Sequence, residues 1–186
     1  MIDYSRPVCR DDIDFGVYER KFLEVDEWLA SGVEFKNSDE GRLVYGRFLL
    51  DITQFAYLHF RIDGVPARLY AYQDLILNDS HRFKFFRSSN QVGKSIALDI
   101  KAARNIIRDH GHAHNEAIVS KSLPQATYQM RRVKGLLKSM PHIVWSEVKG
   151  SADSLSVISV DIKDVDGSVK YTNHLVCAPC LSLIHI

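Results

Sequence analysis

Apolar residues in the first third of the chain recur at helical spacing. One set repeats every three or four residues and stops near Gly32: Phe15, Tyr18, Phe22, Val25 and Leu29. A second set predicts another helix, although Gly46 lies inside it: Val44, Phe48, Ile52 and Phe55. Such one-sided repeats are typical of helices that bury one face. We therefore expect residues 1–65 to form a helical N-terminal region.

Further along, strand-like runs alternate with helical repeats, which is typical of an α/β fold. One of these helices is expected to begin at Ser122, because Pro124 fits a first helical turn and Gln125 can complete a capping box with the serine. Near the end, Asp166-Gly167 favours a tight hairpin turn between two alternating strands. We expect a turn at 63–66, a short helix at 69–77, a strand at 83–86 and a helix at 96–107. A strand at 117–119, a helix at 122–140 and two hairpin strands at 158–162 and 169–171 follow.

The composition is that of a globular protein. Hydrophobic residues make up 46% and charged residues 25% of the 186 residues, which is enough for one domain with a packed core. No apolar run reaches the roughly 18 residues of a membrane span. The first residues lack the basic and then apolar pattern of a signal peptide, so we expect neither secretion nor a membrane partner.

The net charge of +1 hides an uneven distribution. Residues 1–80 carry a net charge of −6, residues 81–138 carry +9, and residues 139–186 carry −2. The basic stretch could attract a polyanion such as nucleotide or nucleic acid, or it could be a solvated surface.

Within the basic stretch, residues 87–95 read as a phosphate-binding loop that lacks its first glycine. The full pattern is Gly, four residues and then Gly-Lys-Ser/Thr, and Ser88 stands where that glycine would be. An expected strand precedes the loop and an expected helix follows it, so the positive end of the helix dipole would face the phosphates. The candidate phosphate-binding residues are Ser88, Ser89, Asn90, Gln91, Val92, Gly93, Lys94 and Ser95.

Tyr72-Gln73, about twenty residues before this loop, adds a second motif. The pair, taken together with residues 89–95, resembles the ATPase domain of the large terminase subunit of tailed phages, a viral DNA-packaging motor. The resemblance covers about residues 55–171. It implies an ASCE-type P-loop NTPase fold with a mainly parallel sheet and flanking helices. Residues 66–180 would form only part of that ATPase domain. Residues 1–65 would be the helical adjunct that precedes this domain.

The resemblance also implies roles for individual residues. Gln73 would lie at the adenine of ATP with Tyr72 beside it, and a side-chain amide does match the adenine N6/N7 edge. Lys94 would be the catalytic cation at the β and γ phosphates, and the Ser95 hydroxyl would hold Mg²⁺. Many members of the family place an arginine where this chain has Asn90. The identity of the arginine that would sense the γ-phosphate is therefore left open.

The implied partners are double-stranded viral DNA, a portal protein and a small terminase subunit. The complete protein would form a homo-oligomeric ring on the portal, in the cytoplasm of an infected bacterial host.

Two parts of the family pattern are missing from this sequence. No apolar strand ending in Asp-Glu follows the loop, and there is no nuclease domain. Val25-Asp26-Glu27 precedes the loop and falls on a helical pattern, so we reject it as a substitute. Residues 181–186 are the in-frame translation of a sequencing-adapter end, so we expect the native protein to continue past Cys180. A fragment cut there would be inactive as an ATPase, and poorly soluble or only partly folded.

Two other function classes fit the same motifs. A helicase-like, nucleic-acid-dependent ATPase shares the glutamine motif and the loop, and a second motor domain downstream would identify it. A nucleotide-binding module or small kinase is the further alternative. DNA-stimulated ATP hydrolysis would separate a motor from a kinase.

Overall fold

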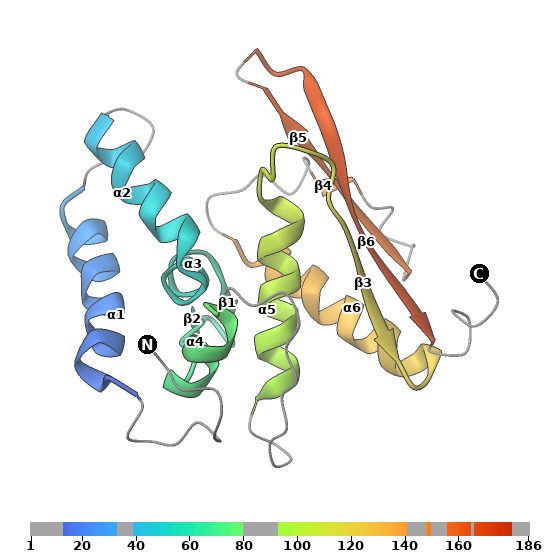
Figure 1. Cartoon of the computed structure of the whole chain (residues 1–186), viewed down its shortest axis with the longest axis horizontal. Coiled ribbons are helices and arrows are strands. Elements are labelled where there is room, and N and C mark those ends of the chain that lie inside the picture. Colours follow the sequence, from blue (N-terminus) through green and yellow to red (C-terminus); the bar gives the residue numbers. More distant parts are fainter. Residues whose placement is uncertain are drawn as a thin grey trace.

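The computed structural model describes residues 13–32, 39–79, 93–140, 148–149, 156–164 and 166–179. Helices α1 to α4 lie on one side of α5, and the main sheet lies on its other side (Figure 1). The helices are α1 (Phe15–Ala30), α2 (Asp39–Leu50), α3 (Ile52–His59), α4 (Ala71–Leu77), α5 (Lys94–Ile107) and α6 (Leu123–Lys138). The strands are β1 (Arg61–Ile62), β2 (Val65–Pro66), β3 (Asn115–Ser120), β4 (Val148–Lys149), β5 (Val157–Lys163) and β6 (Val169–Pro179). The chain is thus mixed α/β, as expected.

The second predicted helix is two helices, which corrects the sequence interpretation. Asp51 separates α2 from α3, with extended backbone angles of φ −89° and ψ 117°. Its Oδ1 atom accepts hydrogen bonds from the amides of Thr53 at 2.8 Å and Gln54 at 3.0 Å. An aspartate in this position satisfies the free amides of a new helix, so it starts α3 rather than continuing α2.

The main sheet has the strand order β3-β6-β5-β4. β3 pairs in parallel with β6, whereas β6 with β5 and β5 with β4 are antiparallel. The prediction of a mainly parallel sheet is therefore wrong for the part of the chain that the structure describes. The cause is the short connection at Asp166-Gly167, since a tight turn can join only antiparallel neighbours.

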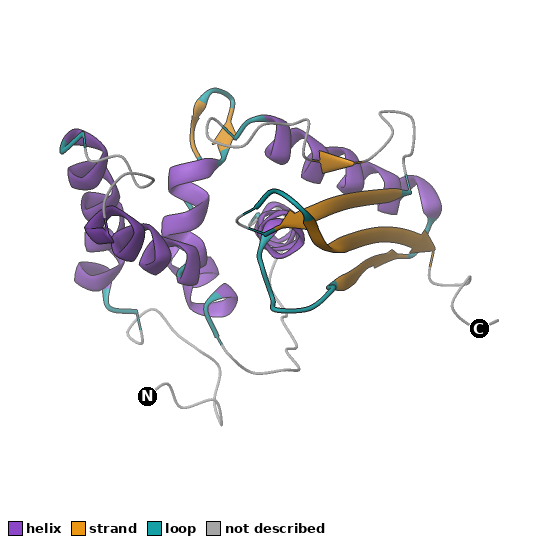
Figure 2. Ribbon diagram, turned by 90° about the horizontal axis from the view of Figure 1, so that it is seen from above, coloured by secondary structure: helices purple, strands orange, loops and turns teal. Residues whose placement is uncertain are grey.

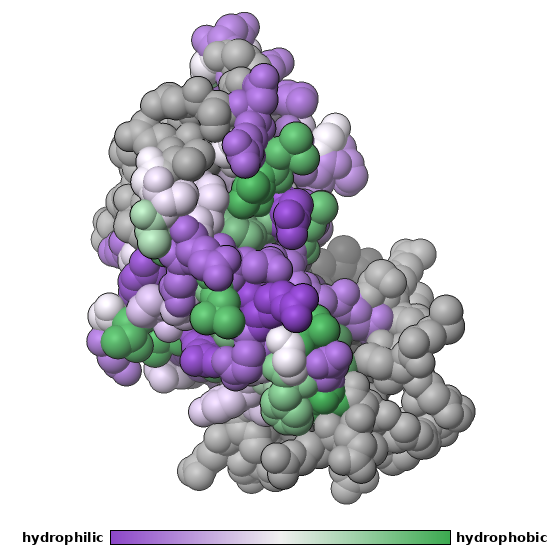
Figure 3. All heavy atoms as spheres, turned by 90° about the vertical axis from the view of Figure 1, so that its left-hand side faces the viewer, coloured by the Kyte–Doolittle hydropathy of each residue, from purple (hydrophilic) through white to green (hydrophobic). Residues whose placement is uncertain are grey.

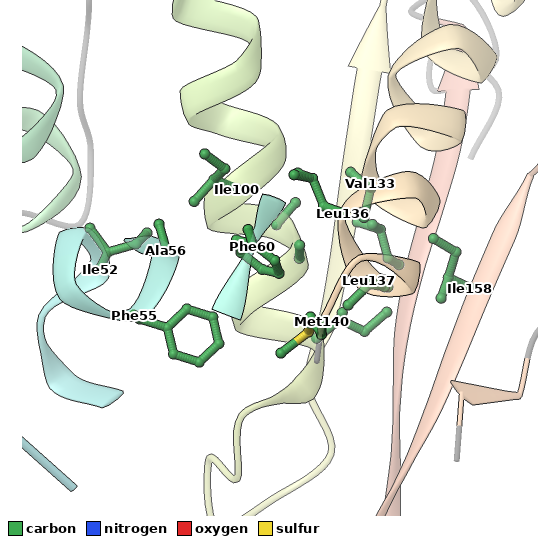
Figure 4. Packing of buried hydrophobic residues seen from close by; sticks show 14 of the residues in the cluster. Ile52, Phe55, Ala56, Phe60, Ile100, Val133, Leu136, Leu137, Met140 and Ile158 are labelled. Atoms are coloured by element: carbon green, nitrogen blue, oxygen red, sulfur yellow. The ribbon is translucent and has the colours of Figure 1, made fainter. Parts of the chain in front are cut away.

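Helices α5 and α6 pack against one face of this sheet. The core joins Ile158 of β5 to Ile100 of α5 and Val133 of α6 (Figure 4). Leu175 of β6 and Phe55 of α3 belong to the same cluster. The expected boundary between residues 65 and 66 thus lies within one continuous core.

Two buried polar side chains hold helix ends to this core. Asn173 of β6 is fully buried and donates to the carbonyls of Ile106 at 2.9 Å and Arg108 at 3.0 Å, at the end of α5. Its Oδ1 atom accepts from the His114 amide at 2.9 Å. Arg104 of α5 donates to the carbonyl of Leu50 at 3.0 Å, at the end of α2, and burial lowers the pKa of Arg104 to about 10.

The second face of the sheet is covered by no helix among the described elements (Figure 2). Its polar rows are joined by cross-strand bonds, such as Ser159 Oγ to His174 Nδ1 at 2.9 Å. Its apolar end exposes Val119 and Val176. On the face that carries α1 and α2, by contrast, hydrophobic atoms lie in small groups among hydrophilic ones (Figure 3).

Candidate functional site

The site is built around the start of α5. Gly93 is the residue before the helix and has left-handed backbone angles, φ 74° and ψ 17°. Lys94 and Ser95 are the first two residues of the helix, Lys94 partly buried and Ser95 exposed. The positive end of the helix dipole and the first free amides of α5 are therefore at the predicted Gly-Lys-Ser tripeptide. Such an end attracts anions.

The structure joins the two predicted motifs by a direct contact. Gln73 Nε2 donates to the Gly93 carbonyl at 2.9 Å, across twenty positions of sequence. Gln73 Oε1 accepts from the Tyr70 amide at 2.7 Å. Only 3% of Gln73 is exposed, because its side chain lies between its own helix, α4, and the start of α5. The motifs thus share one site, although the amide of Gln73 is engaged by protein backbone.

Gly93 is suited to this position in two independent ways. Its φ of 74° lies in the region that side chains disfavour. A Cβ atom at this residue would also lie 2.8 Å from Gln73 Nε2, which is closer than real contacts allow. The glycine of the Gly-Lys-Ser tripeptide therefore permits both the backbone turn and the close approach of Gln73.

A pocket of about 800 Å³ adjoins Gly93 and Gln73. Its walls come from α1, α5, α6 and the segment that precedes α4. They include Arg68, Tyr70, Ile96 and Arg132. Tyr70 is 63% exposed, and its ring stacks on that of Tyr72 with centroids 5.9 Å apart. Arg68 is paired with Glu19 of α1. The pocket thus combines an exposed aromatic ring with two cationic side chains beside the start of α5.

An ion pair between α5 and α6 borders this pocket. Asp99 Oδ2 lies 3.0 Å from Arg132 Nε, with Asp99 1% and Arg132 27% exposed at their side chains. Neither carboxylate oxygen has a hydrogen-bond partner among the described residues. Burial raises the pKa of Asp99 to about 7, and the charge of Arg132 opposes this shift only in part. Asp99 was not among the predicted site residues, although an acidic residue between Ile96 and Ile100, on the apolar face, was the signal for it.

A second charged cluster holds α4 to the N-terminal helices. Lys21 Nζ of α1 lies 2.5 Å from Asp74 Oδ1 and 2.6 Å from Asp51 Oδ2. Thr53 Oγ1 donates to the same Asp74 oxygen at 2.6 Å. Burial alone would lower the pKa of Lys21, but the hydrogen bonds to both carboxylates outweigh it and raise that pKa. Asp74 follows Gln73 directly, so this cluster fixes the helix that carries the glutamine.

The structure brings Gln73 into contact with Gly93, and Lys94 and Ser95 follow Gly93 at the start of α5. Tyr72 stacks on Tyr70 and is not among the residues that line the pocket beside Gly93. The expected strand 83–86 and the tail 181–186 lie outside the described residues. So does most of the predicted phosphate loop, namely Ser88, Ser89, Asn90, Gln91 and Val92. Within the described ranges, no three His, Cys, Asp or Glu side chains are grouped to hold a metal ion. The hydroxyl of Ser95 is the candidate Mg²⁺ ligand from the described part of the loop, and its exposed position at the start of α5 fits that role.

Comparisons with known proteins do not identify the chain. No protein-family model matches it, and no curated protein matches it. Among the helices that the structure describes, none has the length and apolarity needed to cross a membrane.

Proposed function

We propose that this chain is the ATP-binding part of a viral DNA-packaging motor, the large terminase subunit. ATP would bind at the start of α5, and its hydrolysis would drive double-stranded DNA into a capsid. The observation that carries the proposal is the 2.9 Å contact between Gln73 and Gly93. The contact supports the proposal because it brings the glutamine of one motif and the glycine of the other into a single site.

The residues at this end of α5 suit a triphosphate. Helix amides and the Lys94 ammonium would stabilise negative charge on the β and γ phosphates, including the charge that develops during phosphoryl transfer to water. Mg²⁺, when bound with ATP, would neutralise phosphate charge, and Ser95 would offer it a hydroxyl. The pocket beside Gly93 would receive the nucleoside, with the exposed ring of Tyr70 as one wall.

The remaining parts of the proposal concern partners. DNA would be held through its phosphates, largely without reading its sequence. Exposed cations that follow the loop, such as Lys121 and Arg131, are candidates for this contact. A portal protein, a small terminase subunit and further copies of the chain would complete the motor in the cytoplasm of an infected bacterium.

Nucleotide binding and hydrolysis test this proposal in two stages. Labelled ATP should bind the protein in the presence of Mg²⁺, and Lys94→Ala should abolish most of that affinity. Hydrolysis that double-stranded DNA stimulates would then support a motor. Transfer of the γ-phosphate to a small acceptor, without any effect of DNA, would identify a kinase and contradict the packaging function.

A further inference from the structure

We infer that Gln73 is a positioning residue for the phosphate loop and does not select adenine. This inference rests on the proposed function, because it concerns the same triphosphate site. It changes the substrate class of that site from ATP alone to nucleoside triphosphates in general.

Both ends of the Gln73 amide are engaged by backbone. Oε1 accepts from the Tyr70 amide at 2.7 Å, and Nε2 donates to the Gly93 carbonyl at 2.9 Å. Reading adenine would require one acceptor and one donor of this amide to face the base together. Each end of the amide has a second hydrogen-bonding position. Because so little of the side chain is exposed, a base reaches that position only if the amide turns outward, which breaks both backbone bonds. With only 3% of Gln73 exposed, the broken groups would stay buried without partners.

The bond to Gly93 controls a group that faces the phosphates. The Gly93 carbonyl also accepts from the Ala97 amide at 3.1 Å, so two donors fix its direction. A trans peptide unit is planar, and its N–H points opposite to its carbonyl. Fixing the Gly93 carbonyl therefore fixes the Lys94 N–H, which points away from the helix toward an incoming anion. Gln73 thus acts on phosphate binding through the peptide that joins Gly93 to Lys94.

The aromatic wall of the pocket is compatible with any base. Tyr70 is 63% exposed and backed by the Tyr72 ring at 5.9 Å and an interplanar angle of 11°. Stacking on an aromatic face tolerates every base, because every base has a π-face. We therefore expect the wild-type protein to bind ATP, GTP and CTP with dissociation constants within about threefold of one another, since no base-edge hydrogen bond is used to discriminate.

The test compares four competitors of labelled ATP: unlabelled ATP, GTP, CTP and inorganic tripolyphosphate. Gln73→Met should weaken all four by a common factor of about five- to tenfold, the equivalent of one or two lost hydrogen bonds. Gln54→Met is the matched control. Gln54 is also buried at 7% exposure, and its amide donates to Glu24 Oε2 at 2.9 Å, away from the loop. It should leave all four affinities unchanged.

Two results would overturn the inference while leaving the proposed function intact. One is a wild-type preference for ATP over GTP of more than about tenfold, which does not depend on whether any variant folds. The other is a Gln73→Met protein that loses base preference but binds tripolyphosphate normally. If the wild-type protein binds none of the four probes, the proposed function fails and this inference fails with it.

Discussion

Replacing Gly93 by alanine tests the geometry at the start of α5. The substitution places a side chain at φ 74° and puts its Cβ atom 2.8 Å from Gln73 Nε2. Left-handed backbone costs a residue with a side chain about 1–2 kcal/mol relative to glycine. Displacing Gln73 should remove one net hydrogen bond, about 1 kcal/mol. We therefore expect the free energy of unfolding to fall by roughly 2–3 kcal/mol.

Urea denaturation followed by circular dichroism measures this loss. It is best done at low protein concentration, because β3 is an edge strand among the strands that the structure describes and its Val119 is exposed. Gly32→Ala is the matched control, since Gly32 has φ 67° but a Cβ atom added there would meet no atom within 4 Å. It should lose only the backbone part, about 1–2 kcal/mol.

A double-mutant cycle isolates the steric part of the effect. In a Gln73→Ala background the close approach is gone, so Gly93→Ala should cost about 1 kcal/mol less than it does in the wild-type protein. The reasoning would be refuted if Gly93→Ala cost no more than Gly32→Ala, or if the background made no difference.

Two further predictions concern stability. Burial raises the pKa of Asp99 to about 7, so the folded state binds an extra proton between about pH 4 and 7, and this carboxyl lowers stability as pH rises through that window. As the pH rises through that range, the free energy of unfolding of Asp99→Asn should increase relative to that of the wild type by up to about 1.4 kcal/mol per pH unit. A difference in urea midpoints that does not change with pH would contradict this. Asn173→Ala removes three buried hydrogen bonds to Ile106, Arg108 and His114 and should cost roughly 3 kcal/mol. The exposed Asn115→Ala serves as its control and should change stability by less than about 0.5 kcal/mol.

Local periodicity was sufficient to predict much of the fold. The expected helix after the loop is α5, the strand at 117–119 is β3, and the alternating residues around Asp166-Gly167 form the β5–β6 hairpin. Ser122 does precede α6, although its side chain makes no capping hydrogen bond. These features depend on neighbours within a few residues, so the sequence pattern contains them.

Features that depend on distant residues were missed. Asp51 interrupts an apolar repeat that runs on through it, and only its capping bonds reveal the break. The parallel pairing of β3 with β6 joins strands about sixty residues apart, and no local pattern specifies it. The Asp99–Arg132 pair and the Gln73–Gly93 bond likewise arise from tertiary packing. The resemblance joined the two motifs in one expected ATP site, but the direct contact between Gln73 and Gly93 could not be deduced from spacing.

The most direct test of the account is the affinity of Lys94→Ala for labelled ATP in the presence of Mg²⁺. Lys101→Ala, two turns further along α5, is the control and should bind ATP as the wild-type protein does. The account predicts that Lys94→Ala binds roughly 10- to 100-fold more weakly, as expected when a charged hydrogen-bond donor to phosphate is lost. Wild-type affinity in Lys94→Ala would contradict the claim that the start of α5 holds a triphosphate.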